Sequence, residues 1–195
     1  MVDEAIALKD KAVEEVSSFF SHIYQFSQGT SKEKQANCGP ASAFIVGKNL
    51  GLNMPSLSAI RASVGAPRGN GGGAFAITTG QLGRAVTKQA EKEGRDIRFD
   101  EDRLSTNVDD ALKKMRESIA AGKQVVLLTS NIVSGSRGHY VVINKVNDDG
   151  SIEVSDPQSK NGAGRVHSRQ ELETALKRRT NRYGLQSTLL TFEEK

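Results

Sequence analysis

The chain has 195 residues, of which 36% are hydrophobic and 26% charged, with no tryptophan and a formal net charge of +4. This length and polarity predict one compact domain, with at most a small appendage. A single cysteine excludes an internal disulfide, and no run approaches the ~18 apolar residues of a membrane span.

The N-terminus is acidic, and glutamate and serine interrupt its apolar residues, so we predict no secretory signal. Apolar residues recur with helical spacing over residues 3–26. We therefore expect an N-terminal helix over 1–26, either part of the fold or appended, before a main domain over 27–195. Because no signal peptide is predicted, we expect the chain to be synthesised in the cytoplasm. Export by a route that needs no signal peptide stays open.

The rest of the chain predicts helices first and then strands. We expect helices over 41–50, from Thr78 to about Glu93, from Asn107 or Asp109 to about Ala121, and from Arg169 to about Arg178, with Ser168 and Glu171 as a capping box. We expect strands over 97–99, 125–129, 140–146, 152–154 and 185–192, with a hairpin turn at 148–150. This order favours the α+β class, with a mainly antiparallel sheet.

The single cysteine, Cys38, lies where a polar segment gives way to the helix expected over 41–50. Gly39 and Pro40 follow it, and proline suits the first turn of a helix because its missing N–H would be unpaired there. The unpaired N–H groups and the dipole of a helix start lower the pKa of a nearby thiol. The flank therefore favours a nucleophilic thiol over a buried structural cysteine.

A histidine and an aspartate stand at the ends of the predicted hairpin. His139 opens the first strand, and Asp156 follows the second strand. A hairpin turn at 148–150 brings these ends together, as a base and the carboxylate that orients it would require. A surface histidine, a turn aspartate before Pro157, and Gln158 as the orienting group stay open as alternatives.

In the order Cys38, His139 and Asp156, the chain resembles the papain-like cysteine peptidases, most of all the domains that cut double-glycine leaders from bacteriocins. The resemblance covers about residues 28–180. It implies a helical half packed on the sheet, a nucleophile at Cys38, a general base at His139 and an orienter at Asp156. The stretches that carry it are Cys38-Gly39-Pro40-Ala41-Ser42, residues 121–128, Gly138-His139-Tyr140-Val141-Val142, Asp156-Pro157 and the helix over 169–178.

One position departs from the family pattern. The family's oxyanion-hole glutamine stands about six residues before the cysteine, where this chain has Lys32. Gln35 and Asn37 are the candidates to replace it, with Gln28 as a third. The backbone N–H of Cys38 would supply the other donor.

The resemblance implies amide-bond hydrolysis through an acyl-enzyme, with a protein or peptide as substrate, in a chain whose size suits a secreted bacterial effector or toxin. A papain-fold glutamine deamidase, an amidase acting on cell-wall peptides and a catalytically silent binding module stay open as alternatives.

Other kinds of site find little support. Three histidines and one cysteine show no ligand spacing, so we predict neither a metal nor a cofactor. The basic run over 177–182 lacks interleaved aromatic residues, which favours a solvated helix end over a nucleic-acid site. No strand precedes the glycine-rich segment over 69–74, so we expect a loop bordering the cleft rather than a dinucleotide site. We expect no membrane partner, and the oligomeric state stays open.

Overall fold

A computed structural model describes residues 22–28, 34–66 and 76–195, so most of the helix expected over 3–26 lies outside the described residues. Its described end is not α-helical: residues 22–24 are irregular, and Gln25–Ser27 form a 3-10 helix, η1. The backbone N–H of Gln25 donates to the carbonyl oxygen of Pro157 at 2.8 Å. This segment therefore packs beside the residue that follows Asp156, and the division of the chain at residue 27 stays a prediction.

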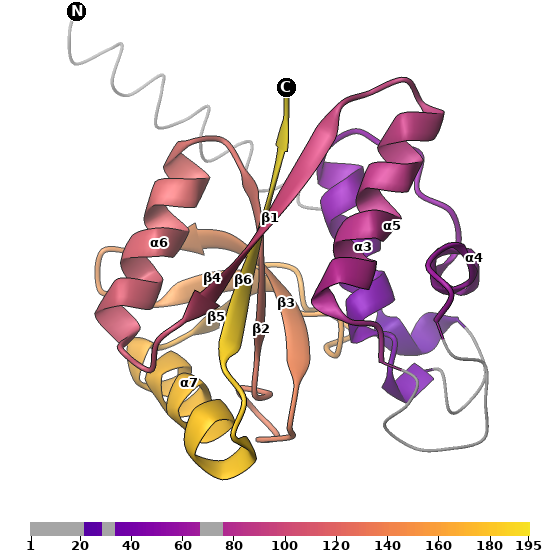
Figure 1. Ribbon diagram of the computed structural model, residues 1–195. Coiled ribbons are helices and arrows are strands. Elements are labelled where there is room, and N and C mark those ends of the chain that lie inside the picture. The colour runs from indigo at the N-terminus through magenta and orange to yellow at the C-terminus, as the bar shows by residue number, and fades with distance from the viewer. Residues whose placement is uncertain (1–21, 29–33, 67–75) are drawn as a thin grey trace, which may run out of the picture.

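An antiparallel six-stranded sheet forms the centre of the described structure, in the order β1-β6-β2-β3-β4-β5 (Figure 1). Each neighbouring pair runs antiparallel, and the C-terminal strand β6 lies between β1 and β2. The strands are β1 (Ile97–Leu104), β2 (Gln124–Thr129), β3 (His139–Val146), β4 (Ile152–Ser155), β5 (Arg165–His167) and β6 (Ser187–Glu194).

Helices cover both faces of this sheet (Figure 1). On one face lie α3 (Cys38–Asn49), α4 (Leu57–Ser63) and α5 (Thr79–Lys92), and on the other lie α6 (Val108–Ala120) and α7 (Arg169–Tyr183). The expected α+β class is confirmed, with the addition that the sheet has two buried faces.

The central strands supply side chains to two separate cores. Val126 and Val142 pack on the side of α3 and α5, whereas their neighbours Val125 and Val141 pack on the side of α6 and α7. Successive residues of a strand point to opposite faces. The burial of both faces explains why β2 and β3 are apolar along most of their length instead of alternating with polar residues.

Most helix starts follow caps that are visible in the sequence. Thr78 with Gln81 forms a capping box at α5, and Ser168 with Glu171 forms one at α7. The Asn107 side chain accepts N–H groups of the first turn of α6. Two bounds differ from expectation: α3 already begins at Cys38, and α7 continues to Tyr183, where Gly184 in the left-handed conformation ends it.

Three elements were missed or underestimated. The short helix α4 and the three-residue strand β5 were not expected, and β1 extends to Leu104 instead of ending near Phe99. The added part of β1 is polar and mostly exposed, and it is held by its pairing with β6. Such strands lack the apolar alternation on which prediction depends.

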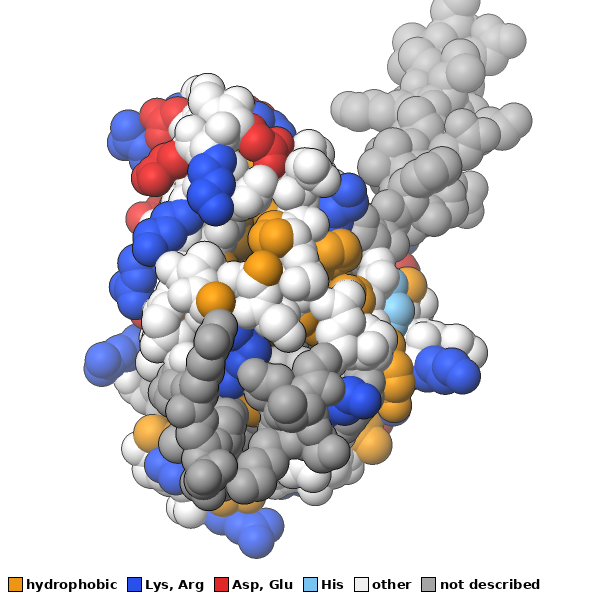
Figure 2. All heavy atoms as spheres, turned by 90° about the vertical axis from the view of Figure 1, so that its right-hand side faces the viewer, with side chains coloured by type: hydrophobic (Ala, Val, Ile, Leu, Met, Phe, Trp, Pro, Cys, Tyr) orange, Lys and Arg blue, Asp and Glu red, His pale blue; other side chains and the backbone are white. Residues whose placement is uncertain are grey.

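Figure 2 shows how charged side chains are distributed on one face of the molecule. On the face formed by α3, α4 and α5, Lys and Arg side chains are spread apart, whereas Asp and Glu gather at one end (Figure 2). Across the described ranges, no helix combines the length and the apolar character needed to cross a membrane.

Candidate active site

Cys38 is the first residue of α3, and its side chain is almost buried, with 8% exposed. A Cβ atom at Gly39 would lie 2.5 Å from the Ile77 side chain and 3.3 Å from that of Tyr140. Glycine is therefore needed here, because a larger residue would collide with the Ile77 and Tyr140 side chains that pack against the helix start. Pro40 occupies the first turn, where its lack of an N–H costs nothing.

The hairpin of β3 and β4 brings His139 and Asp156 together. The two strands pair Val142 with Ser155, and a register shift between Ile143 and Lys145 adjusts the alignment of their ends. His139 Nε2 lies 2.7 Å from Asp156 Oδ1, and both side chains are buried. The paired residues end at Val142 and Ser155, so His139 and Asp156 meet just beyond the paired part of the hairpin.

His139 also lies close enough to the Cys38 thiol for each side chain to shift the pKa of the other. Because Nε2 faces Asp156, Nδ1 is the ring nitrogen left for the sulfur. Burial alone would raise the pKa of Cys38, but His139 and the backbone N–H groups of Tyr140 and Gly39 lower it below its usual value. The site therefore favours a thiolate.

The pKa of His139 moves in the opposite direction. Burial would lower it, but hydrogen bonds to Asp156 and Cys38 and the negative charge of both raise the pKa well above its ordinary value. A lowered pKa on the thiol and a raised pKa on the imidazole have one common cause, which is mutual stabilisation of a thiolate–imidazolium pair.

Asp156 is held in its ionised form by several donors. Oδ1 also accepts the backbone N–H of Gln158 at 2.9 Å, and Oδ2 accepts Nη1 of Arg165 at 3.4 Å. Burial would raise the pKa of Asp156, but His139 and these groups lower it. The Gln158 side chain bonds to Asn131. Of the two proposed orienters, only Asp156 therefore meets the imidazole.

The oxyanion candidates from the sequence are placed less favourably. Gln35 is exposed. The Asn37 carboxamide donates to the carbonyl oxygens of Gln25 at 3.3 Å and of Gln28 at 3.0 Å, which uses both of its N–H groups. Gln28 accepts the backbone N–H of Leu57 through its side-chain oxygen. The Asn37 side chain therefore has no N–H group left to donate to an oxyanion beside Cys38.

Gln25 is a candidate that sequence reasoning missed. Its side chain is 3% exposed, and its Oε1 has no hydrogen-bond partner among the described residues. Its backbone bonds to Asn37, which precedes Cys38, and to Pro157, which follows Asp156. Gln25 lies farther from the cysteine than the family spacing, so no spacing rule would have selected it.

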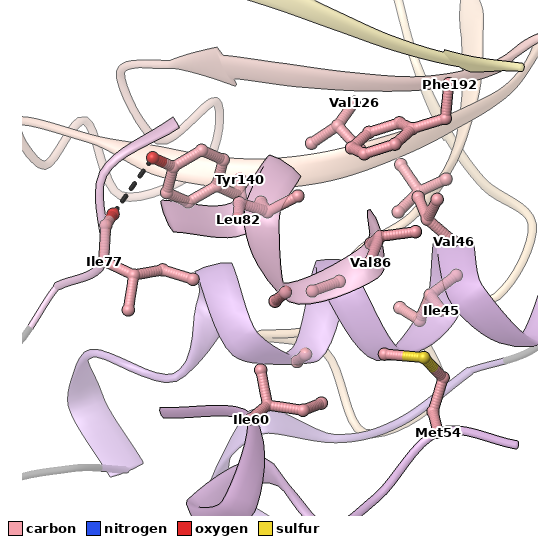
Figure 3. Packing of buried hydrophobic residues seen from close by; sticks show 14 of the residues in the cluster. Ile45, Val46, Met54, Ile60, Ile77, Leu82, Val86, Val126, Tyr140 and Phe192 are labelled. Atoms are coloured by element: carbon pink, nitrogen blue, oxygen red, sulfur yellow. Dashed lines mark hydrogen bonds between the residues drawn. The ribbon is translucent and has the colours of Figure 1, made fainter. Parts of the chain in front are cut away.

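A cavity of about 640 Å³ opens beside Cys38. Residues 76–79, which precede and begin α5, line one wall, and Leu128 and Tyr140 line the sheet side. The Tyr140 hydroxyl donates to the Ile77 carbonyl at 3.1 Å and ties the two walls together (Figure 3). The glycine-rich segment over 69–74 lies outside the described residues.

The cavity also contains part of the basic run over 177–182. Arg179 and Arg137 line it, and Arg179 is buried. The expectation of a wholly solvated helix end is therefore wrong for Arg179, because α7 turns this residue inward while Arg182 stays exposed.

The other two histidines lie in different settings. His22 Nε2 lies 3.0 Å from the Ser159 carbonyl oxygen, and His167 is buried, which lowers its pKa. Within the described ranges, no three His, Cys, Asp or Glu side chains gather as a metal site would require.

Comparison with models of protein families gives a match over most of the chain. A sequence model of the peptidase C39-like family matches residues 19–187, a range that includes Gln25, Cys38, His139 and Asp156. No curated protein sequence matches the chain. Among solved structures, the avirulence protein AvrPphB of Pseudomonas aligns at 12% identity over 91% of this chain and 99% of that chain, with a TM-score of 0.39. A TM-score of this size supports no structural argument, so the family match carries the assignment.

Proposed function

Because this chain belongs to the peptidase C39-like family and is a papain-like cysteine peptidase, we propose that Cys38, His139 and Asp156 form its catalytic triad. The reaction is hydrolysis of an amide bond in a protein or peptide substrate. The observation that carries this proposal is the hydrogen bond between His139 and Asp156, together with a Cys38 thiol close enough to the same imidazole for each to favour the charged form of the other.

The first half of the reaction forms an acyl-enzyme. The Cys38 thiolate attacks the substrate carbonyl carbon, a C–S bond forms, and the carbonyl oxygen becomes an oxyanion. The His139 imidazolium donates its Nδ1 proton to the leaving amine as the C–N bond breaks. Asp156 accepts the Nε2 hydrogen throughout, which fixes the ring and favours its charged form.

The second half returns the enzyme to its starting state. Neutral His139 takes a proton from water, the oxygen of that water attacks the thioester carbon, and the C–S bond breaks. The products are the carboxylic acid of the substrate, the thiolate and the imidazolium, so the proton taken from water replaces the one given to the amine.

We assign the oxyanion donors to the backbone N–H of Cys38 and the carboxamide of Gln25. The backbone N–H of Cys38 belongs to the first turn of α3, where N–H groups have no intrahelical acceptor. Gln25 is supported by its burial and by backbone bonds to the neighbours of both Cys38 and Asp156.

The direct test is the reactivity of Cys38. An activated thiolate should react with iodoacetamide at pH 6 faster than free cysteine does, because little of the free thiol is ionised there. Ordinary thiol kinetics would contradict the proposal. His139→Ala should remove the advantage, whereas His22→Gln should keep it, since the bond that His22 forms among the described residues is to the Ser159 carbonyl.

Activity gives the second test. Cys38→Ala should abolish peptide cleavage while leaving the circular dichroism spectrum unchanged, and residual cleavage by this variant would rule the mechanism out. Mass spectrometry of a treated proteome then separates cleavage from deamidation, since new chain termini indicate the first and a small mass gain at glutamine indicates the second. A role as a secreted effector or toxin is a further proposal, tested by whether host-cell proteins are among the cleaved substrates.

A further inference from the structure

The cavity beside Cys38 contains a buried cation without a counter-ion. Arg179 has 7% of its surface exposed and forms no ion pair with a carboxylate among the described residues. Burial lowers the pKa of Arg179, Tyr140 raises it, and Arg137, a second cation, lowers it. Removing a guanidinium from water without a compensating anion is costly.

The hydrogen bonds of Arg179 leave part of the guanidinium unused. Nε donates to the Gln186 carbonyl at 2.9 Å, and Nη1 donates to the Arg137 carbonyl at 2.7 Å. Both acceptors are neutral, and Nη2 has no partner in the described ranges. A guanidinium carries five N–H donors, so N–H groups remain for a ligand.

The position of this guanidinium relates it to the catalytic residues. A Cβ atom at Gly138 would lie 3.1 Å from Arg179 Nη1, and Gly138 directly precedes His139. Arg137, Gly138 and Arg179 line the same cavity as Cys38. A group bound by Arg179 would therefore lie in the cavity that Cys38 borders, beside the segment that leads into His139.

The surroundings strengthen the attraction of an anion. Leu128 and Leu185 line the cavity, and apolar walls exclude water, which makes an ionic contact stronger than it is in bulk solvent. Arg137 is exposed, and no ion pair with another described residue holds it. Glu101 acts on Tyr140 but is not among the groups that act on Arg179.

We propose that this cavity binds a carboxylate of the substrate, so that the peptidase selects peptides with an acidic group beside the scissile bond. Arg179 is the partner inside the cavity, and Arg137 assists at its exposed side. A carboxylate accepts two parallel N–H groups of a guanidinium, which gives both affinity and direction. The substrate class rests on the proposed function, but the carboxylate site does not depend on turnover.

The first experiment needs no substrate and compares two alkylating reagents at Cys38. Iodoacetate carries a carboxylate, and iodoacetamide is its neutral analogue. The rate ratio of iodoacetate to iodoacetamide, divided by the same ratio for free cysteine, should be about tenfold or more in the unaltered protein. Because the imidazolium of His139 also attracts an anion, the comparison between variants decides the source of the preference.

Arg179→Gln and Arg137→Gln should each lower this ratio, with the larger loss for Arg179→Gln. Arg182→Gln is the matched control, since Arg182 lies on the same helix but is exposed, and it should leave the ratio unchanged. An unaltered protein that behaves like free cysteine, or an Arg179→Gln ratio equal to that of the unaltered protein, would overturn the proposal. If Arg179→Gln fails to fold, Arg137→Gln, at an exposed position, decides in the same way.

The second experiment uses matched peptides and identifies the source of the carboxylate. One series exchanges Glu for Gln at each position around the cleaved bond, and another exchanges a free C-terminus for an amide. We expect about 10- to 100-fold higher kcat/KM for the acidic member of one pair. A preference in the first series assigns the site to an acidic side chain, and one in the second assigns it to a chain end.

The Arg179→Gln variant separates recognition from a structural role. Recognition predicts that the acidic peptide loses its advantage while the neutral peptide is cleaved within a few-fold of the original rate. Equal losses on both peptides would mean that Arg179 only positions the chain before His139, and equal rates on all pairs would exclude the site. If no peptide is cleaved but the alkylation ratio behaves as expected, the proposed function fails and the carboxylate site stands.

Discussion

Two buried charges lie near His139, and their surroundings differ. Asp156, with 3% exposed, has a histidine, an arginine and a backbone N–H around its carboxylate. Arg179 is almost as buried, but its guanidinium bonds to two neutral carbonyls, and no carboxylate in the described structure faces it.

The groups around Asp156 form a finished network, by which we mean that every charge in it has a partner from the same chain. The groups around Arg179 form an incomplete one, because the positive charge has no such partner among the described residues. A buried charge with partners from its own chain is stabilised before substrate arrives, as a group that must hold the imidazole in one orientation requires. A buried charge without an opposite partner gains favourable electrostatic energy when a ligand supplies that partner. In the triad and the carboxylate site that we propose, catalysis and recognition occupy neighbouring sites with opposite charge balance.

The strongest way to break the finished network is Asp156→Asn. The amide keeps the size of the carboxylate but neither its charge nor its capacity to accept from Nε2 at both oxygens, so kcat/KM should fall by roughly 10²- to 10⁴-fold. Steady-state kinetics on any cleaved peptide measures the loss. Asp148→Asn, in the exposed hairpin turn, is the control, and a variant at Asp156 that stays within a few-fold of it would contradict the triad.

Gln25→Ala tests whether the network extends to the oxyanion. Loss of one oxyanion donor should lower kcat by about 10²- to 10³-fold with little change in KM, because the interaction is strongest in the transition state. Gln28→Ala is the matched control, since its side-chain oxygen bonds to the Leu57 N–H. An unchanged kcat in Gln25→Ala would return the search to the other polar groups before Cys38.

The pH profile reports the charge balance of the finished network. Activity should fall at acidic pH, where the thiolate of Cys38 takes a proton despite its lowered pKa, and above about pH 9, where His139 loses the proton that the leaving amine needs. Each limb should approach about tenfold per pH unit. Asp156→Asn should move the alkaline limb to lower pH, because the carboxylate raises the pKa of His139. An unmoved limb would disprove the coupling.

The smallest effect is expected from Arg165→Gln. The Arg165 side chain is 36% exposed, and its contact with Asp156 Oδ2 is 3.4 Å long. Water screens such a pair, so kcat/KM should fall by less than about tenfold. A loss as large as that of Asp156→Asn would show that the cation is essential to the network and would weaken the contrast with Arg179.

The parts of the site that could be predicted depend on local signals. Cys38 before Gly39 and Pro40 indicates a helix start, and His139 stands before a run of β-branched residues. The caps at Thr78, Asn107 and Ser168 mark helix starts because a side chain bonds to N–H groups two or three residues away. Each signal lies within a few residues, so it can be recognised in the sequence without knowledge of the fold.

The sequence by itself predicted the order of most elements and the three residues that we propose as nucleophile, base and orienter, because helix starts and hairpins bring those residue types to defined ends of their elements. Only the tertiary structure decided that Gln25 lies between the neighbours of Cys38 and Asp156, and that Arg179 alone of its basic run faces the cavity. Burial and charge pairing arise from contacts between residues far apart in the chain, and no local pattern of residue types records them.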